Sequence, residues 1–540
     1  MKKDTENKEQ ITRRTDEPQI KGFKDVLILI KTNYLLLIVF AILSFAIYGN
    51  VIKGQFLNLD DIAGFVTNPN TKNIPLALKN YDGASLYKAV IAHVFGVKAP
   101  VYHVFSILFH ITNSILVFIF AYILFGKKPA LITTFLFITN PVNSEAVCWL
   151  SGYPYLLRAF VILNILIYYC LFRRSNKKIY LLISGVIFFI GMFSFSGGGW
   201  LFITPFLLVL IDQYVFEKKI QFKNIRYYIP IIIVSSIFAA MFLPGFFKQR
   251  VTDLTTLYYV KIETETPLVN RIPYSIFMAY KLIAFPNELI IYHEGKILTG
   301  PMYAFMVVVT IAIVAGIFIM IKKNRPVGGL MAAIIFTILP CFAPTIIAWT
   351  AAERYLYISS VFFLMGIALL LISAEEKFKI KKLAFYITCL LVLLYSIRAV
   401  VRTEDYKSSK NMWLASRKTA PYSYRVYNNL GDVYADEGKY ELAIENFKRS
   451  WALKPDYADA VHNIGYVYWQ LRDVVNAKKY LNLAIQMNPR LYQSYSTLGG
   501  IAIAEGNAAA AAQYFTSCLD ADPTNVDCKN GLIRLSQIQQ

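Results

Sequence analysis

The sequence predicts an all-α protein in two parts, a polytopic bundle of membrane helices followed by an α-solenoid of short helical repeats. Of its 540 residues, 56% are hydrophobic and the mean hydropathy is +0.46, far above the value for a soluble globular protein. Apolar residues concentrate in roughly the first 400 positions, whereas residues 402–540 are mixed polar and amphipathic. Within that second part, small residues and prolines recur every 34 positions.

Eleven segments are long and apolar enough to cross a bilayer, which takes about 20 residues per helix. They lie at 33–52, 101–125, 129–148, 155–172, 179–197, 200–216, 227–243, 301–321, 328–347, 355–373 and 383–401. The further apolar stretch 274–292 contains Pro286, and counting it as a span would reverse every later basic loop across the membrane. We therefore predict about eleven spans and one re-entrant or interfacial element that is broken at Pro286.

Lysine and arginine predict the orientation, because short cytoplasmic loops carry an excess of both residues. Alternate loops contain such clusters, at 127–128, 173–178, 218–226, 322–325 and 377–382. The pattern predicts a cytoplasmic tail over 1–24, a transmembrane domain over 25–401 and a C-terminal part on the outer face. The net charge of +21 is then a consequence of topology and does not indicate nucleic-acid binding.

The 34-residue period is that of the tetratricopeptide repeat (TPR), a pair of packed helices. Three sets of positions share it: Gly431, Gly465 and Gly499; Ala443, Ala477 and Ala511; and Pro455, Pro489 and Pro523. The small residues let paired helices approach closely, and each proline ends a second helix. We predict a linker or half repeat over 402–423, three repeats over 424–524 and a capping helix over 525–540. Such an array offers a concave groove to an acceptor or partner protein.

Two adjacent carboxylates follow the first span, in the segment LNLDDIAGFVTNPN (57–70). One of Asp60 and Asp61 could act as a general base for an acceptor hydroxyl, with its pKa perturbed by the other. The alternative interpretation is a solvated turn.

Charged side chains at predicted helix ends are the other candidates. Glu145 and Arg158 flank the outer turn of NPVNSEAVCWLSGYPYLLR, and charges at membrane depth are costly unless they are paired or functional. Arg158 could instead extend toward lipid head groups. Glu353 and Arg354 lie in the turn AAERYLYIS, where the guanidinium could hold a phosphate or the two residues could form a structural ion pair.

These segments occur in a recognisable order: the Asp60–Asp61 loop, YHVFSILFHITNSILVF, NPVNSEAV, RIPYSIFMAYKLIAFPNEL, AERYLYIS and the repeats. The set, which runs over most of residues 34–535, resembles the transmembrane and TPR-repeat-containing O-mannosyltransferases and their bacterial relatives. These belong to the C-type (GT-C) glycosyltransferase superfamily. The resemblance implies a GT-C-like transmembrane bundle, a polyprenyl-phosphate-linked sugar as donor and a protein Ser or Thr hydroxyl as acceptor on the outer face.

The resemblance also implies roles for the candidate residues. The acidic pair of the superfamily falls on Asp60 and Asp61, one of which takes the hydroxyl proton while the anomeric carbon is attacked. Arg354, with Arg158 or Arg271, would stabilise the departing lipid phosphate, and the two glutamates would support the site. The sequence leaves open whether a divalent cation assists.

Three departures from the family pattern suggest a second hypothesis. Asn140 and Asn143 replace histidines, FSGGGW at 195–200 replaces a Lys-Glu pair, and GYPYLL at 152–157 replaces a GRADLL-like stretch. These changes fit a different donor or acceptor, or a non-catalytic scaffold whose TPR groove recruits partners to a cell-envelope assembly. A ligase that moves whole oligosaccharides is a third hypothesis and would need a wider cavity.

Cysteine and histidine form no pattern of metal ligands. Cys518 and Cys528 flank Pro523, where they could form a disulfide in an oxidising compartment or pack as free thiols. No Asn-x-Ser/Thr sequon occurs in the chain. This absence, with the Ile- and Lys-rich composition, favours a bacterial inner membrane with a periplasmic repeat array over the endoplasmic reticulum.

Overall fold

The computed structural model describes residues 20–80, 83–194, 198–256, 268–291, 293, 300–342 and 350–538, and every regular element within these ranges is a helix. The all-α prediction is therefore confirmed. The chain divides into two units with its main boundary after Ser408. The membrane unit combines Met1–Pro244, Pro267–His293 and Leu298–Ser408. The second unit, called the repeat unit below, combines Ser409–Gln540 with two short stretches, Gly245–Thr266 and Glu294–Ile297. The predicted tail lies mostly outside the described residues.

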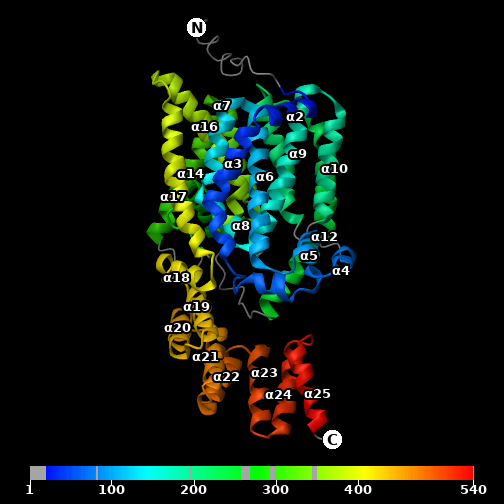
Figure 1. The fold of residues 1–540 in the computed structure, drawn as a ribbon, viewed down its shortest axis with the longest axis vertical. Coiled ribbons are helices and arrows are strands. Elements are labelled where there is room, and N and C mark those ends of the chain that lie inside the picture. Colours follow the sequence, from blue (N-terminus) through cyan, green and yellow to red (C-terminus); the bar gives the residue numbers. More distant parts are fainter. Residues whose placement is uncertain are drawn as a thin grey trace. The chain divides into compact units, whose positions relative to one another are not determined.

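Seven helices of the described chain are long and apolar enough to cross a membrane. They are α3 (Tyr34–Tyr48, extended by η2, Gly49–Lys53), α6 (Ala99–Phe125), α9 (Tyr153–Ser175), α12 (Ile229–Thr256), α14 (Gly300–Lys323), α16 (Tyr357–Phe378) and α17 (Leu383–Asp405). Figure 1 shows α3, α6, α9 and α17 running in nearly the same direction. Shorter apolar helices accompany them: α5 (Gly83–Phe95), α10 (Lys178–Ser194), α11 (Thr204–Leu210) with η8 (Ile211–Phe216), and α15 (Arg325–Thr337). The chain is a multi-pass membrane protein, and its number of spans stays a prediction.

The predicted span 129–148 is not a single helix. It contains α7 (Lys127–Thr139), which ends where Asn140 caps the N–H of Val142 and Pro141 supplies no backbone donor. Short helical turns follow, named η5 (Pro141–Asn143), α8 (Ser144–Cys148) and η6 (Leu150–Gly152). The segment that carries Glu145 is therefore a compact turn between α7 and α9.

The helix predicted to break at Pro286 is α13 (Leu268–Ala284), which ends two residues before that proline. Its re-entrant path in the membrane stays a prediction.

The central helices of the membrane unit are α6, α9 and α16, in which 72%, 67% and 61% of the residues in the apolar stretch are buried. The same share is 17% in α14 and in α17. The outer helices expose large apolar side chains such as Phe305 and Leu393. Water does not tolerate so much exposed apolar surface, so lipid covers these helices.

The repeat unit consists of antiparallel helix pairs. The pairs are α19 (Tyr424–Asp436) with α20 (Tyr440–Leu453), α21 (Ala458–Gln470) with α22 (Val474–Met487), and α23 (Tyr492–Ala504) with α24 (Ala508–Ala521). They are preceded by α18 (Ser409–Thr419) and followed by α25 (Val526–Ile538), which a disulfide between Cys518 and Cys528 joins to α24. A Cβ added to Gly431 would lie 2.6 Å from the Phe447 ring, which explains the small residue at this period.

Valine in place of Gly465 is expected to destabilise the repeat unit by about 1–3 kcal/mol, because overpacking forces the helices apart. A Cβ there would lie 2.9 Å from Leu481 Cγ and 3.1 Å from the backbone oxygen of Ala477. The matched control is Gly500→Ala, since nothing lies within 4 Å of a Cβ at that position and alanine favours the helix. Thermal unfolding of the full chain, followed by far-UV circular dichroism, should separate the two variants. Equal melting temperatures would contradict the packing argument.

Candidate functional site

The acidic pair after the first span consists of one exposed and one buried carboxylate. Asp60 is exposed, whereas Asp61 is fully buried. One oxygen of Asp61 accepts hydrogen bonds from the backbone N–H and the hydroxyl of Ser151, at 2.8 and 2.6 Å, and the other accepts from the N–H of Leu57 at 3.0 Å. Asp61 therefore ties the loop to η6, and Asp60 is the carboxylate of the pair that solvent reaches.

The stability of this loop is expected to depend on pH. Burial raises the pKa of Asp61 to about 6, although its hydrogen bonds oppose the shift. An unfolded aspartate has a pKa of about 3.9, so between these values the folded state binds more protons and stability falls as pH rises. We expect the melting temperature to fall from about pH 4 to about pH 6 in the wild type and in Asp60→Asn, and to fall less in Asp61→Asn. Identical slopes in all three chains would refute this account.

A lysine that the sequence interpretation did not select, Lys88 on α5, also holds the loop. Its Nζ donates to the carbonyl oxygen of Gly64 at 2.8 Å and lies 4.1 Å from the centre of the Phe65 ring. Phe65 in turn packs edge-on against Tyr102 and Tyr153. The loop that carries Asp60 is therefore anchored on both sides by buried contacts.

Glu145 and Arg354 form a buried ion pair, although they are 209 residues apart in sequence. Glu145 lies on α8, and Arg354 lies on the short helix η12 (Glu353–Leu356). The guanidinium contacts one carboxylate oxygen, and the backbone N–H of Arg354 donates to the other at 2.8 Å. The guanidinium also lies 5.1 Å from the centre of the Trp149 ring, so it is held on two sides.

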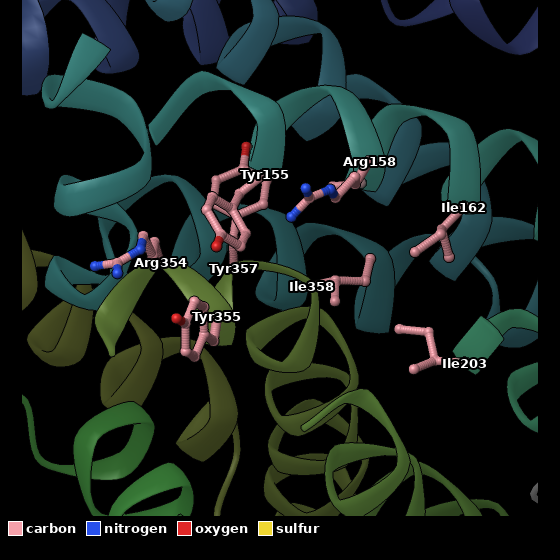
Figure 2. Close-up of a pocket in the computed structure, with 9 residues that line it drawn as sticks. Tyr155, Arg158, Ile162, Ile203, Arg354, Tyr355, Tyr357 and Ile358 are labelled. Atoms are coloured by element: carbon pink, nitrogen blue, oxygen red, sulfur yellow. The ribbon is translucent and has the colours of Figure 1, made fainter. Parts of the chain in front are cut away.

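Arg354 and Arg158 line the same small pocket, which is partly open to solvent. Its lining consists of Tyr155, Arg158, Ala159, Ile162, Ile203, Arg354, Tyr355, Tyr357 and Ile358. Figure 2 shows Arg354 and the tyrosines at one end and Ile162 and Ile203 at the other. The pocket is thus polar and cationic at one end and apolar at the other.

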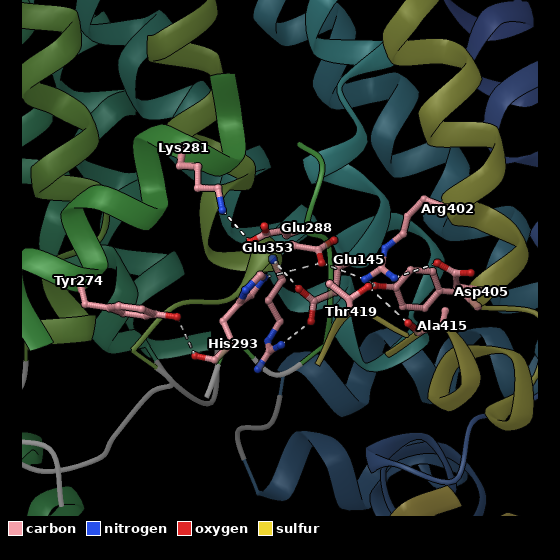
Figure 3. Close-up of polar contacts among 12 residues, drawn as sticks. Glu145, Tyr274, Lys281, Glu288, His293, Glu353, Arg402, Asp405, Ala415 and Thr419 are labelled. Carbon is pink, nitrogen blue, oxygen red and sulfur yellow. Dashed lines mark hydrogen bonds and ion pairs between the residues drawn. The ribbon is translucent and has the colours of Figure 1, made fainter. Parts of the chain in front are cut away.

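The neighbouring Glu353 does not pair with Arg354, so the alternative prediction of an ion pair between these two residues is wrong. Its carboxylate accepts a hydrogen bond from Nη2 of Arg402 at 2.8 Å, and Nε2 of His293 lies 3.9 Å from the same oxygen (Figure 3). Arg402 belongs to α17 and was not among the predicted site residues. Two residues adjacent in sequence are thus bound to two different helices.

The third predicted arginine, Arg271 on α13, is not among the residues that line the Arg158–Arg354 pocket. Only 3% of it is exposed, and its Nε and Nη2 atoms have no hydrogen-bond partner among the described residues. One helical turn later, Ser275 lines a second small pocket, and Tyr355 lines both pockets. The structure therefore brings Arg158 and Arg354 together and places Arg271 near the adjoining pocket.

Asn140 and Asn143 are buried and bind the backbone. Asn140 donates to the carbonyl oxygen of Ile283 at 3.3 Å, and Asn143 donates to that of Phe137 at 2.8 Å. Part of the FSGGGW departure, residues 195–197, lies outside the described residues.

Comparison with known families confirms the repeats. "TPR repeat" matches residues 431–471, and "Tetratricopeptide repeat" matches 458–491 and 492–525. Repeats of this kind also occur in proteins with other names, since BBSome complex member BBS4 of Xenopus tropicalis is 34% identical over 17% of this chain and 17% of its own length. The repeat unit alone is therefore a weak guide to function.

A longer match includes the membrane unit. Protein O-mannosyl-transferase F38B6.6 of Caenorhabditis elegans is 22% identical over 473 residues, which is 81% of this chain and 64% of its own. That alignment is far too long to fit within the repeats. Over most of its length the chain is therefore similar to a protein named as an O-mannosyl-transferase. Protein O-mannosyl-transferase TMTC3 of Homo sapiens is 24% identical over 27% of this chain and 16% of its own, so this chain spans less than two thirds of either relative.

A solved structure, the APC/C hetero-tetramer Cut9-Hcn1, aligns with 86% of this chain and 95% of its own at 10% identity. The TM-score of 0.26 is too low for an inference about the fold.

Proposed function

We propose that this chain is a membrane glycosyltransferase of GT-C architecture that moves a sugar from a polyprenyl phosphate to Ser or Thr hydroxyls of a protein. Mannose is the first sugar to test, because the relatives are named O-mannosyl-transferases. The acceptor oxygen bonds to the anomeric carbon, the bond from that carbon to the phosphate oxygen breaks, and the hydroxyl proton passes to Asp60. The products are the glycosylated protein and the polyprenyl phosphate.

This proposal depends most on the segment 144–158, which contributes both to the support of the acidic loop and to the Arg158–Arg354 pocket. Ser151 holds the acidic loop, Glu145 holds Arg354, and Arg158 lines the pocket. The segment is itself compact, because the N–H of Trp149 donates to the carbonyl oxygen of Glu145 at 3.2 Å. A general base and a phosphate-binding pocket supported by one rigid turn are what a transfer between lipid phosphate and hydroxyl requires.

The pocket suits an amphiphilic donor. Guanidinium groups of Arg158 and Arg354 can stabilise charge on the departing phosphate, as anion-binding groups do when they are fixed before the reaction. The isoleucines at the other end can accept the first isoprene units. Arg271 supports the same proposal, because no carboxylate among the described residues is hydrogen-bonded to it and a buried, unpaired guanidinium is costly unless an anion reaches it.

The repeat unit is proposed to bind the acceptor protein on the outer face, with the N-terminus in the cytoplasm. The disulfide between Cys518 and Cys528 supports this side, since disulfides persist in oxidising compartments. A bacterial inner membrane with a periplasmic repeat array is the setting we propose.

Reconstitution tests the function directly. The full chain in lipid nanodiscs is mixed with polyprenyl-phosphate mannose and a library of Ser- and Thr-containing peptides, and mass spectrometry detects peptides that gain one hexose. We expect hexose on hydroxyl residues only when the lipid donor is present. A chain that neither binds polyprenyl phosphate nor modifies any peptide would be a scaffold instead of an enzyme.

A further inference from the structure

Arg402 is a buried charged side chain beside the candidate site that the function proposed above does not use. It is 1% exposed and lies in the last turn of α17. Its Nη2 donates to Glu353 at 2.8 Å and to the hydroxyl of Tyr406 at 3.0 Å, and its Nη1 donates to Asp405 at 2.9 Å. Figure 3 shows Arg402 and Asp405 on one side of Glu353 and His293 on the other.

The arrangement keeps two ion pairs apart that could otherwise exchange partners. Glu353 and Arg354 are adjacent in η12, yet Glu353 binds Arg402 while Arg354 binds Glu145. Each of the two glutamates is fully buried, so each needs a cation. If Arg402 were absent, the nearest cation on the same short helix would be Arg354. Capture of Arg354 by Glu353 would draw the guanidinium away from Glu145 and from the pocket.

We propose that Arg402 is a positioning residue, which occupies Glu353 so that Arg354 stays paired with Glu145 at the edge of the donor pocket. The inference rests on the proposed function, because it concerns the affinity of that pocket for a lipid phosphate. It adds to the proposed function that donor binding depends on Arg402. The geometry of the phosphate-binding arginine is set by the end of α17, the helix whose chain continues into the repeat unit after Ser408.

The test measures binding of a fluorescent polyprenyl phosphate to the full chain in nanodiscs. Arg402→Gln should weaken binding at least about 10-fold, as expected when a charge-assisted contact to the phosphate is lost. The decisive variant is the double substitution Glu353→Gln/Arg402→Gln, in which no carboxylate remains to capture Arg354. We expect the double variant to bind within about 3-fold of wild type. Because the double variant also removes the unpaired buried charge, thermal unfolding is measured on the same preparations: weak binding by Arg402→Gln that is still folded supports the positioning role, whereas binding lost only as the fold is lost shows a merely structural role.

Arg398 supplies a matched control. It is on the same helix and within electrostatic range of Glu353, but it makes no hydrogen bond to Glu353 in the described structure. Arg398→Gln removes the same charge, so a binding loss equal to that of Arg402→Gln would show that net charge matters and would overturn the positioning role.

The outcomes also separate this inference from the proposed function. A wild-type chain that binds no polyprenyl phosphate ends both. Suppose instead that the wild type binds. The positioning role is then refuted if Arg402→Gln binds equally well, or if the double variant binds as weakly as the single one, and the proposed function still stands. If Arg402→Gln fails to fold, the double variant still decides, since it leaves no unpaired buried charge. Near-wild-type binding in that chain supports the role, and a 10-fold loss refutes it.

Discussion

Asparagine in place of Asp60 is expected to lower kcat for sugar transfer by about 10²–10⁴-fold, the usual contribution of a general base. The amide keeps the size of the carboxylate but cannot take the proton of the acceptor hydroxyl. The melting temperature should not change, because Asp60 is exposed and the bonds that hold the loop belong to Asp61. Single-turnover transfer at saturating donor, measured beside thermal unfolding, tests both halves of the prediction.

The adjacent carboxylate gives the matched control. Asp61→Asn should lower stability by about 1–3 kcal/mol, because an amide N–H then faces a donor from Leu57 or Ser151 and leaves it unsatisfied. Transfer at the wild-type rate in Asp60→Asn would remove Asp60 as the base. If Asp61→Asn lost transfer but kept its stability, Asp61 would be the base and Asp60 would not.

The parts of the fold that the sequence predicted well are those with a repeating physical signal. A period of 34 residues places Gly431, Gly465 and Gly499 correctly against the second helix of each pair, because close packing excludes a larger side chain at every repeat. Hydropathy likewise located all seven long apolar helices. It failed at 129–148, where an apolar run continues across a break that only Asn140 and Pro141 signal.

The sequence predicted which residues belong to the site but not which of them bind one another. Glu145 and Arg354 were both selected for their charge at a helix end, but nothing in the sequence says that they meet across 209 residues. Glu353 and Arg354 looked like a pair because they are adjacent. In the structure, however, each binds a side chain from a different helix, Glu353 one on α17 and Arg354 one on α8. Arg402 was missed because an arginine at the end of a span resembles an interfacial anchor.

Methionine in place of Arg354 is expected to cost about 3–5 kcal/mol of folding free energy, because it leaves Glu145 buried without a counter-charge. The double variant Glu145→Gln/Arg354→Met removes both charges, so most of that stability should return. Donor binding should not return, since the guanidinium that lines the pocket is missing in both chains. Thermal unfolding and binding of fluorescent polyprenyl phosphate, measured on the same preparations, distinguish the two effects.

The partly exposed Arg158 completes the comparison, because Arg158→Met alters the same pocket at a side chain that is only partly buried. It should weaken donor binding with less than about 1 kcal/mol of lost stability, as is usual for a substitution at a partly exposed position. If the double variant regains the stability that Arg354→Met loses but does not regain donor binding, Arg354 is assigned to the donor phosphate. If the double variant recovered binding as well, the ion pair would serve the fold alone, and the phosphate would have to be held by Arg158 or Arg271.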